Sequence, residues 1–278
     1  MRALAEYAMN GRRQVILAVL LCGLLPIINY LPAALVALVC LRKGWQEAIL
    51  ILVWAILPAG AWAVVGDPIP LVLLAGTCCL AITLRETESW QLVLLASIAI
   101  AIVTEMSLRL IPELLTNMVE QLKIALNEFN FAVPPGFTDA DYRQYVVAIY
   151  GLLHMVMSIT MLVLARRWQA QLYNPGGFQE EFHKVRIENK AALVLTALFI
   201  LAINGVPVLQ GWTYYFMVPL LMSGMALVHG IVGIKKLPKV LLVIFYFLMM
   251  MPTMLLILVL VALIDSWYDF RKRIQVLD

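Results

Sequence analysis

The stretch WQLVLLASIAIAIVTEMSLRLI, at residues 90–111, is the part of the chain that decides the fold. It is almost wholly apolar and carries charge only at Glu105 and Arg109. An α-helix rises about 1.5 Å per residue, so about 20 apolar residues cross the ~30 Å hydrocarbon core of a bilayer. Lipid offers no partner to an unpaired backbone amide, and a helix satisfies these amides internally. Residues 90–111 are therefore predicted to be a membrane-spanning helix.

Apolar stretches of the same kind recur along the rest of the chain. Apolar residues make up 63% of the sequence and charged residues 13%, and the mean hydropathy is +0.93, as in integral membrane proteins. Segment 31–41 is too short to cross, and we expect a half-span or the short arm of a hairpin there. We predict an all-α, polytopic transmembrane helical bundle of about eight to nine membrane segments, forming a single integral membrane domain over residues 1–278. The other segments are 14–30, 46–65, 68–84, 144–165, 191–209, 213–234 and 239–264, with kinks expected at Pro26, Pro58, Pro219 and Pro252.

The composition argues against several classes of function. A net charge of +3 without a basic patch or an aromatic platform excludes a nucleic-acid partner. The four cysteines lie inside apolar segments without metal-ligand or redox spacing, which favours a packing role. There is no HExxH motif and no nucleophile-elbow serine, so we expect no catalytic residues, no metal and no cofactor. An intramembrane enzyme acting on a lipid-linked substrate is the weaker alternative.

Basic residues in short loops indicate the orientation, because they stay on the cytoplasmic side. Arg12 and Arg13 place the N-terminus in the cytoplasm, in what we expect to be a bacterial inner membrane. The same rule places loop 113–142 outside and loop 166–190 inside. Nine crossings would put the basic residues 271–273 outside, against the rule. Either one segment does not cross or the tail is an exception, and the sequence leaves the side of the C-terminus open.

Two loops carry recognisable content. In the extracytoplasmic loop, apolar residues of 113–130 recur at three- and four-residue intervals, which predicts an amphipathic helix on the outer membrane surface or a lid over the bundle. In the cytoplasmic loop, the sequence NPGG at 174–177 predicts a tight reversal, because proline fixes φ and glycine permits positive φ. This loop is a candidate docking surface for a partner protein. Its candidate residues are Arg166, Arg167, Trp168, Tyr173, Asn174, Pro175, Gly176, Gly177 and Phe178.

The stretch 166–182, together with DSWYDFRKR at residues 265–273, resembles the YybS-like family of bacterial membrane proteins. The similarity covers nearly the whole chain, with both motifs at the expected ends. That family is largely uncharacterised, so the resemblance implies a polytopic membrane fold and little chemistry.

A second resemblance concerns the first half of the chain. A basic N-terminus and a proline-containing first span precede a short helix that ends in LRKGW at 41–45, and a hairpin follows that ends in LRE at 84–86. This order is similar to the substrate-capture subunits of energy-coupling-factor vitamin transporters. The resemblance implies a small-molecule ligand inside a helical bundle and a membrane or ATPase partner protein.

Polar residues within apolar segments are the candidates for a substrate site, because a charge inside a span costs about 2.5–3.5 kcal/mol on insertion scales. Glu105 and Arg109 stand four residues apart on one helical face, where they line a cavity or neutralise each other near the outer end. His154 and His229 bind a ligand or bridge helices by hydrogen bonds. Asn204, before Gly205 and Pro207, marks either a broken helix that binds a ligand or a simple helix end.

Two functions follow from these patterns. The first is small-molecule binding or transport in a helical bundle, with Glu105, Arg109, His154, Asn204 and His229 at the site. The second is a non-transporting membrane scaffold or regulator that binds a partner complex through loop 166–190.

Overall fold

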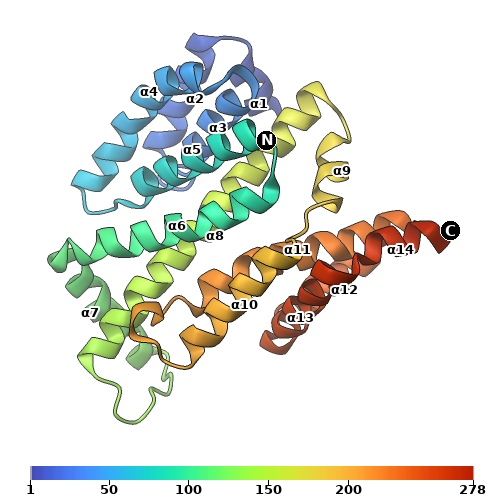
Figure 1. Ribbon diagram of the computed structural model, residues 1–278. Helices are drawn as coiled ribbons and strands as arrows, with labels where there is room; N and C mark the ends of the chain where they lie inside the picture. Colours follow the sequence, from blue (N-terminus) through green and yellow to red (C-terminus); the bar gives the residue numbers. More distant parts are fainter. Residues whose placement is uncertain (1, 278) are drawn as a thin grey trace. The chain divides into compact units, whose positions relative to one another are not determined.

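The computed structural model describes residues 2–277 and is entirely helical over that range, with fourteen α-helices and one short 3-10 helix (Figure 1). The chain divides into two compact units. Unit 1 comprises Met1–Arg85 and Ala96–Ala165, and unit 2 comprises Glu86–Leu95 and Arg166–Asp278. The all-α class and the multi-pass membrane character expected from the sequence are confirmed.

The first eight helices build unit 1, although α5 ends, α6 begins and α8 ends in unit 2. They are α1 (Arg2–Met9), α2 (Arg12–Leu24), α3 (Leu31–Lys43), α4 (Trp45–Val64), α5 (Ile69–Thr87), α6 (Trp90–Arg109), α7 (Pro112–Glu128) and α8 (Asp139–Tyr173). The remaining elements belong to unit 2. They are α9 (Gly177–His183), α10 (Asn189–Ile203), η1 (Pro207–Leu209), α11 (Thr213–Ile234), α12 (Val240–Leu248), α13 (Pro252–Tyr268) and α14 (Phe270–Leu277).

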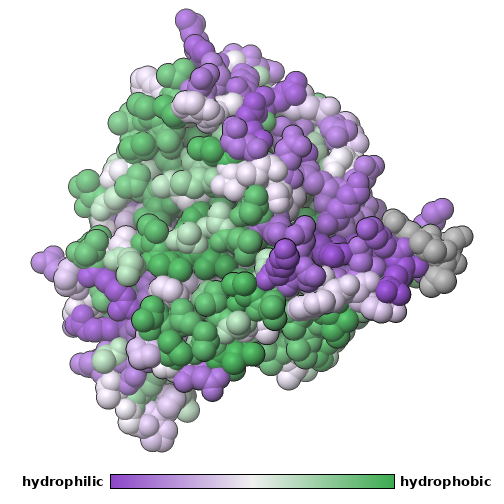
Figure 2. Space-filling model, viewed as in Figure 1, coloured by the Kyte–Doolittle hydropathy of each residue, from purple (hydrophilic) through white to green (hydrophobic). Residues whose placement is uncertain are grey.

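Five helices in the described residues are long and apolar enough to cross a membrane, or six if the bent pair α12–α13 is counted as one span. The five are α4, α5, α6, α8 and α11. This is fewer than the eight to nine segments expected from hydropathy. The reason is length, because α2 and α3 each have 13 residues and α10 has 15, against about 20 for a full crossing. Large apolar side chains nevertheless cover much of the exposed surface (Figure 2), as suits a lipid environment.

Helix α3 shows why a short apolar segment exists without crossing. Every residue from Pro32 to Leu41 is buried inside unit 1. Its C-terminal carbonyl groups are satisfied by Arg85, whose Nη1 donates to the oxygens of Leu41 at 2.7 Å and Cys40 at 3.2 Å. A guanidinium at this end also complements the helix dipole. Segment 31–41 is thus an interior helix of the protein.

Helix α7 covers the segment expected to be amphipathic. Its buried residues Leu115 and Val119 pack with Val146, Val147 and Tyr150 of α8 in one hydrophobic cluster. Lys123 pairs with Asp139 at the start of α8, with Nζ and Oδ1 2.6 Å apart. The apolar face of α7 is therefore covered by the protein's own helix.

The segment 239–264, expected as one span, is broken. The chain bends by 113° between α12 and α13, across Met249–Met251. Pro252 begins α13, where its missing amide hydrogen costs no hydrogen bond of the helix. Helix α12 starts shortly after Ile234 ends α11, and Arg271, just beyond α13, lines the same cavity as Ile234. The start of α14 is thus close to the end of α11, and the bent pair between them is a broken span or a re-entrant loop.

Candidate functional site

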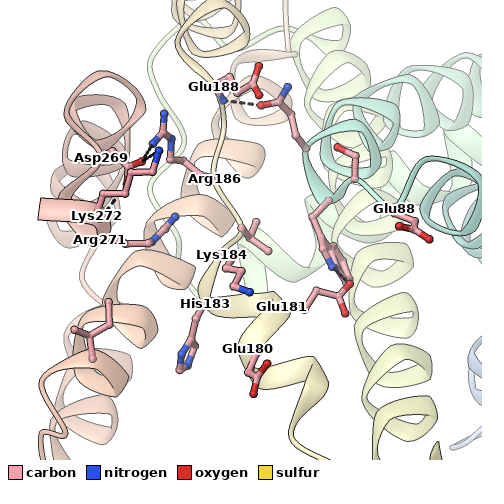
Figure 3. Close-up of a pocket in the computed structure, with 15 residues that line it drawn as sticks. Glu88, Glu180, Glu181, His183, Lys184, Arg186, Glu188, Asp269, Arg271 and Lys272 are labelled. Carbon is pink, nitrogen blue, oxygen red and sulfur yellow. Dashed lines mark hydrogen bonds and ion pairs between the residues drawn. The ribbon is translucent and has the colours of Figure 1, made fainter. Parts of the chain in front are cut away.

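A polar cavity of about 810 Å³ lies within unit 2 (Figure 3). Four segments supply its lining: residues 88–91 around the start of α6, residues 180–188 of α9 and the loop after it, Ile234 at the end of α11, and residues 269–272 at the start of α14. Twelve of the fifteen lining residues are polar, in a chain that is otherwise mostly apolar. Its acidic residues are Glu88, Glu180, Glu181, Glu188 and Asp269, and its basic residues are Lys184, Arg186, Arg271 and Lys272.

Most of the charges are separated by sign across the cavity, although Asp269 lies among the basic residues (Figure 3). Arg186, Arg271 and Lys272 lie on one side, and we call them the basic wall (Figure 3). Glu88, Glu180 and Glu181 form the acidic wall, and Lys184 lies between the two. Opposed walls of this kind recognise a molecule that carries both charges, or two oppositely charged groups of one partner.

The basic wall is built around the junction of α13 and α14. Asp269 ends α13 with φ of 48°, a left-handed conformation that aspartate tolerates better than most residues. Its Oδ2 accepts an ion pair from Arg186 Nη1 at 2.5 Å, and Lys272 Nζ stands 4.0 Å from the same oxygen. Arg186 also donates from Nη2 to the carbonyl of Ser266 at 3.4 Å. These bonds hold the loop after α9 against the start of α14.

Arg271 is the unusual member of the basic wall, because it is a charged residue with only 8% of its surface exposed. Its Nη2 donates to the carbonyl oxygen of Ser223 at 3.3 Å and lies 3.7 Å from Oδ2 of fully buried Asp265. Asp265 Oδ1 accepts from the backbone N–H of Phe270 at 2.9 Å. Arg271 Nε and Asp265 Oδ2 have no hydrogen-bond partner among the described residues. Burial lowers the pKa of Arg271, while the charges of Asp265 and Asp269 act in the opposite direction.

Small residues of α11 allow this packing. A Cβ on Gly230 would lie 3.2 Å from the carbonyl oxygen of His183 and 3.5 Å from Arg271 Nε. A Cβ on Gly233 would lie 2.7 Å from Cε1 of the His183 ring, closer than real contacts allow. Both glycines therefore admit the loop after α9 and the start of α14 to the surface of α11.

The acidic wall is fixed by contacts to residues 88–91 and to the end of α8. Glu181 accepts from Trp90 Nε1 at 2.6 Å through Oε1 and pairs with Arg166 Nη2 at 2.6 Å through Oε2. The Trp90 ring packs edge-on against Phe178, with centroids 6.4 Å apart. Further along the loop, the backbone N–H of Glu188 donates to Gln91 Oε1 at 2.6 Å. These hydrogen bonds, the ion pair and the ring contact therefore fix the position of the acidic wall.

The predicted docking residues provide part of these contacts. Arg166 and Phe178 hold the acidic wall as described, and Trp168 is buried with 2% of its surface exposed. Tyr173, by contrast, is 42% exposed at the start of the turn. The remaining docking residues are Arg167, Asn174, Pro175 and Gly176, which are exposed, and Gly177, which is partly exposed.

His229 and Asn204, two of the predicted substrate residues, belong to unit 2 but do not line the cavity. His229 shares a hydrogen bond of 2.8 Å between Nε2 and Tyr246 Oη, and its ring packs edge-on against Phe182 at 5.5 Å. Asn204 follows the end of α10, and its Nδ2 donates to the carbonyl of Ile200 at 2.7 Å. His229 of α11 is thus bonded to Tyr246 of α12, and Asn204 stands at the end of α10.

Glu105 and Arg109 lie together in unit 1, at the end of α6. Glu105 is buried, with 3% of its surface exposed, and its Oε1 accepts from Arg109 Nη2 at 2.7 Å. The same Nη2 donates to Gln144 Oε1 of α8, also at 2.7 Å. This is the self-neutralising pair, with Arg109 more exposed than its partner.

His154, the remaining predicted substrate residue, is buried in unit 1. Its Nδ1 lies 2.8 Å from the carbonyl oxygen of Tyr150, which can only accept, so Nδ1 is the donor of this hydrogen bond. Nε2 has no partner among the described residues. The hydroxyl groups of Ser158 and Thr77 are also buried and unpartnered. These three groups are a second polar feature of unit 1, to which a small hydrogen-bonding molecule or water would be complementary.

Sequence reasoning did not identify the residues that line the cavity. The stretch DSWYDFRKR at 265–273 contains Asp265, Asp269 and Arg271, but its local pattern does not indicate that residues 180–188 lie beside it. Within the described residues, no group of three or more His, Cys, Asp or Glu side chains is placed to hold a metal ion. The chain shows no significant similarity to any protein-family model, to any curated protein or to any solved structure with which it was compared.

Proposed function

We propose that this multi-pass membrane protein binds a small charged molecule in the polar cavity of unit 2, as the recognition step of a capture or transport function. The observation that carries the proposal is the cavity itself, whose two walls bear opposite charges. A nearly buried arginine is costly unless it is compensated, so its presence in the lining of a cavity favours a functional role. Arg271 and Lys272 both line the cavity, so their positive charges would attract an anionic group bound there.

Both family-like motifs support this choice of site. Glu180 and Glu181 come from the stretch 166–182, and Asp269, Arg271 and Lys272 come from 265–273, and all five line the cavity. We accordingly propose that the chain belongs with the YybS-like proteins and that these two motifs serve a shared binding site. The likeness of the first half to vitamin-capture subunits supports a small-molecule ligand, and an ATPase module is the partner that such a subunit would use.

The distribution of basic residues supports a location of this site on the cytoplasmic side. Lys184, Arg186, Lys235, Arg271 and Lys272 lie around the cavity or beside it, and basic loops stay on the cytoplasmic side of a bacterial inner membrane. The cavity would then load or release its ligand on that side, with the N-terminus on the same side.

Native mass spectrometry of the gently extracted protein tests the proposal. A retained small molecule should be lost from the Lys272→Gln and Glu180→Gln variants, whose side chains are exposed and should not affect folding. Matched controls are Lys190→Gln and Glu86→Gln, because both residues are exposed in unit 2 but do not line the cavity. Loss of the ligand from Glu105→Gln or His154→Ala, with Lys272→Gln unaffected, would place the site in unit 1 and refute the proposal.

The exposed turn at 173–176 favours a second function, as a scaffold for a partner protein. Its base is held by the Arg166–Glu181 pair, while Tyr173 presents an aromatic ring to the surroundings, which is the kind of residue that anchors protein interfaces. Tyr173→Ser should then remove a co-purifying protein and leave ligand binding in the cavity unchanged. Retention of every co-purifying protein would argue against this function.

A further inference from the structure

We infer that the ligand of the cavity is the head group of a zwitterionic phospholipid with a primary ammonium, that is, of the phosphatidylethanolamine class. The inference rests on the proposed function and names its substrate class. The phosphate would bind the basic wall, and the ammonium would bind the acidic wall.

The basic wall has room for one more anionic group. Asp269 already pairs with Arg186 and lies at the limit of ion pairing with Lys272, whose side chain is 83% exposed. Arg271 makes one long hydrogen bond and one ion pair of 3.7 Å, and its Nε is unpartnered among the described residues. A phosphate oxygen at Lys272 would lie beside the positive charge of Arg271, which also lines the cavity.

The acidic wall is complementary to a cation. Glu181 is held by Arg166 and Trp90, but Glu88 and Glu180 form no ion pair within the described residues, and neither does Glu188 at the rim. A primary ammonium has three N–H donors to distribute among such carboxylates. A trimethylated ammonium has none, so the wall distinguishes ethanolamine from choline. A purely anionic head group would face these carboxylates without compensation.

The place of the cavity favours a lipid over a soluble zwitterion. It is lined by Trp90, which begins one candidate span, and by Ile234, which ends another. Trp267 and Tyr268, at the end of α13, are half exposed, as are aromatic residues at a membrane interface. A head group in the cavity would therefore sit at the level of the lipid head groups.

The test is native mass spectrometry of the full-length protein after equilibration with phosphatidylethanolamine, phosphatidylcholine or phosphatidylglycerol, and with soluble O-phosphoethanolamine. We expect the ethanolamine lipid to bind about 10-fold more tightly than the choline lipid, the effect of about one charge-assisted hydrogen bond. Glu180→Gln should abolish this preference, and Lys272→Gln should weaken binding of the ethanolamine lipid. Lys190→Gln and Glu86→Gln should change neither.

Each other outcome overturns a defined part of the account. Tighter binding of phosphatidylglycerol, weakened by Lys272→Gln, would exclude the zwitterion but keep the cavity as a binding site. Binding of O-phosphoethanolamine as tightly as of the lipid would exclude the lipid source. Binding of all four probes that is indifferent to both Glu180→Gln and Lys272→Gln would overturn the inference and the proposed function together.

Discussion

Removal of Asp265 should strongly destabilise unit 2, because it would leave Arg271 buried without its nearest carboxylate. The two side chains are 3.7 Å apart, and Asp265 is fully buried while the Arg271 side chain is 10% exposed. Breaking a buried ion pair by removing one partner costs about 3–5 kcal/mol, because the remaining charge is uncompensated. Asp265→Ala also removes the acceptor of the Phe270 N–H, a bond of 2.9 Å, which adds about 1 kcal/mol.

A double replacement separates the charge from the packing. Asp265→Leu with Arg271→Met removes both charges at similar volume, and such replacements are often neutral or stabilising. We expect the double variant to recover most of the stability that Asp265→Ala loses, although the Phe270 N–H stays unpaired. Equilibrium unfolding in mixed detergent and SDS, followed by tryptophan fluorescence, measures these differences. A cost below about 1 kcal/mol for Asp265→Ala, or a double variant less stable than the sum of its singles, would refute the buried-pair reasoning.

Three further predictions concern other parts of the molecule. Gly23→Ala should destabilise unit 1 by about 1–3 kcal/mol, because the added Cβ would lie 2.5 Å from Cγ of the rigid Pro58 ring. Gly60→Ala is the control, because a Cβ at Gly60 meets open space and should not destabilise the unit. Thermal unfolding of both variants measures the difference. The pKa of His183 is lowered by burial and then by Arg271, so its contribution to stability is present above the ordinary histidine pKa and is lost as the pH falls through the lowered value. His183→Gln should flatten that part of the stability–pH profile, and an unchanged profile would contradict the burial of the ring. Reporter fusions at the C-terminus and in loop 173–176 should give the same side of the membrane, because residues 180–188 and 269–272 line one cavity. Opposite sides would show that α12–α13 crosses the membrane.

The longest spans were predictable because hydropathy alone determines them. Residues 46–65, 68–84 and 90–111 correspond closely to α4, α5 and α6, whose lengths match a bilayer core. Hydropathy does not distinguish lipid from protein as the apolar surroundings, so α3 resembled a membrane segment although it is interior to unit 1. The sequence predicts a kink at Pro252 within a single span. Instead, Pro252 begins α13 after a break at Met249–Met251.

The cavity could not be predicted because it depends on tertiary contacts between distant segments. Arg186 and Asp269 are far apart in the sequence, and no local sequence pattern indicates that their side chains form an ion pair. The intramembrane residues were easier to find, since charge in an apolar run is conspicuous. Glu105 and Arg109 proved to neutralise each other, a pairing that follows from their spacing on one helix.

The most direct test of the central claim is an electron cryo-microscopy map of the protein in nanodiscs that contain phosphatidylethanolamine. We expect non-protein density for a lipid head group in the cavity of unit 2, with the phosphate of the head group at Arg271 and Lys272 and its ammonium at Glu180. A cavity whose own walls have closed on each other, with Lys184 paired to Glu180 or Glu188 and no density between them, would contradict the claim.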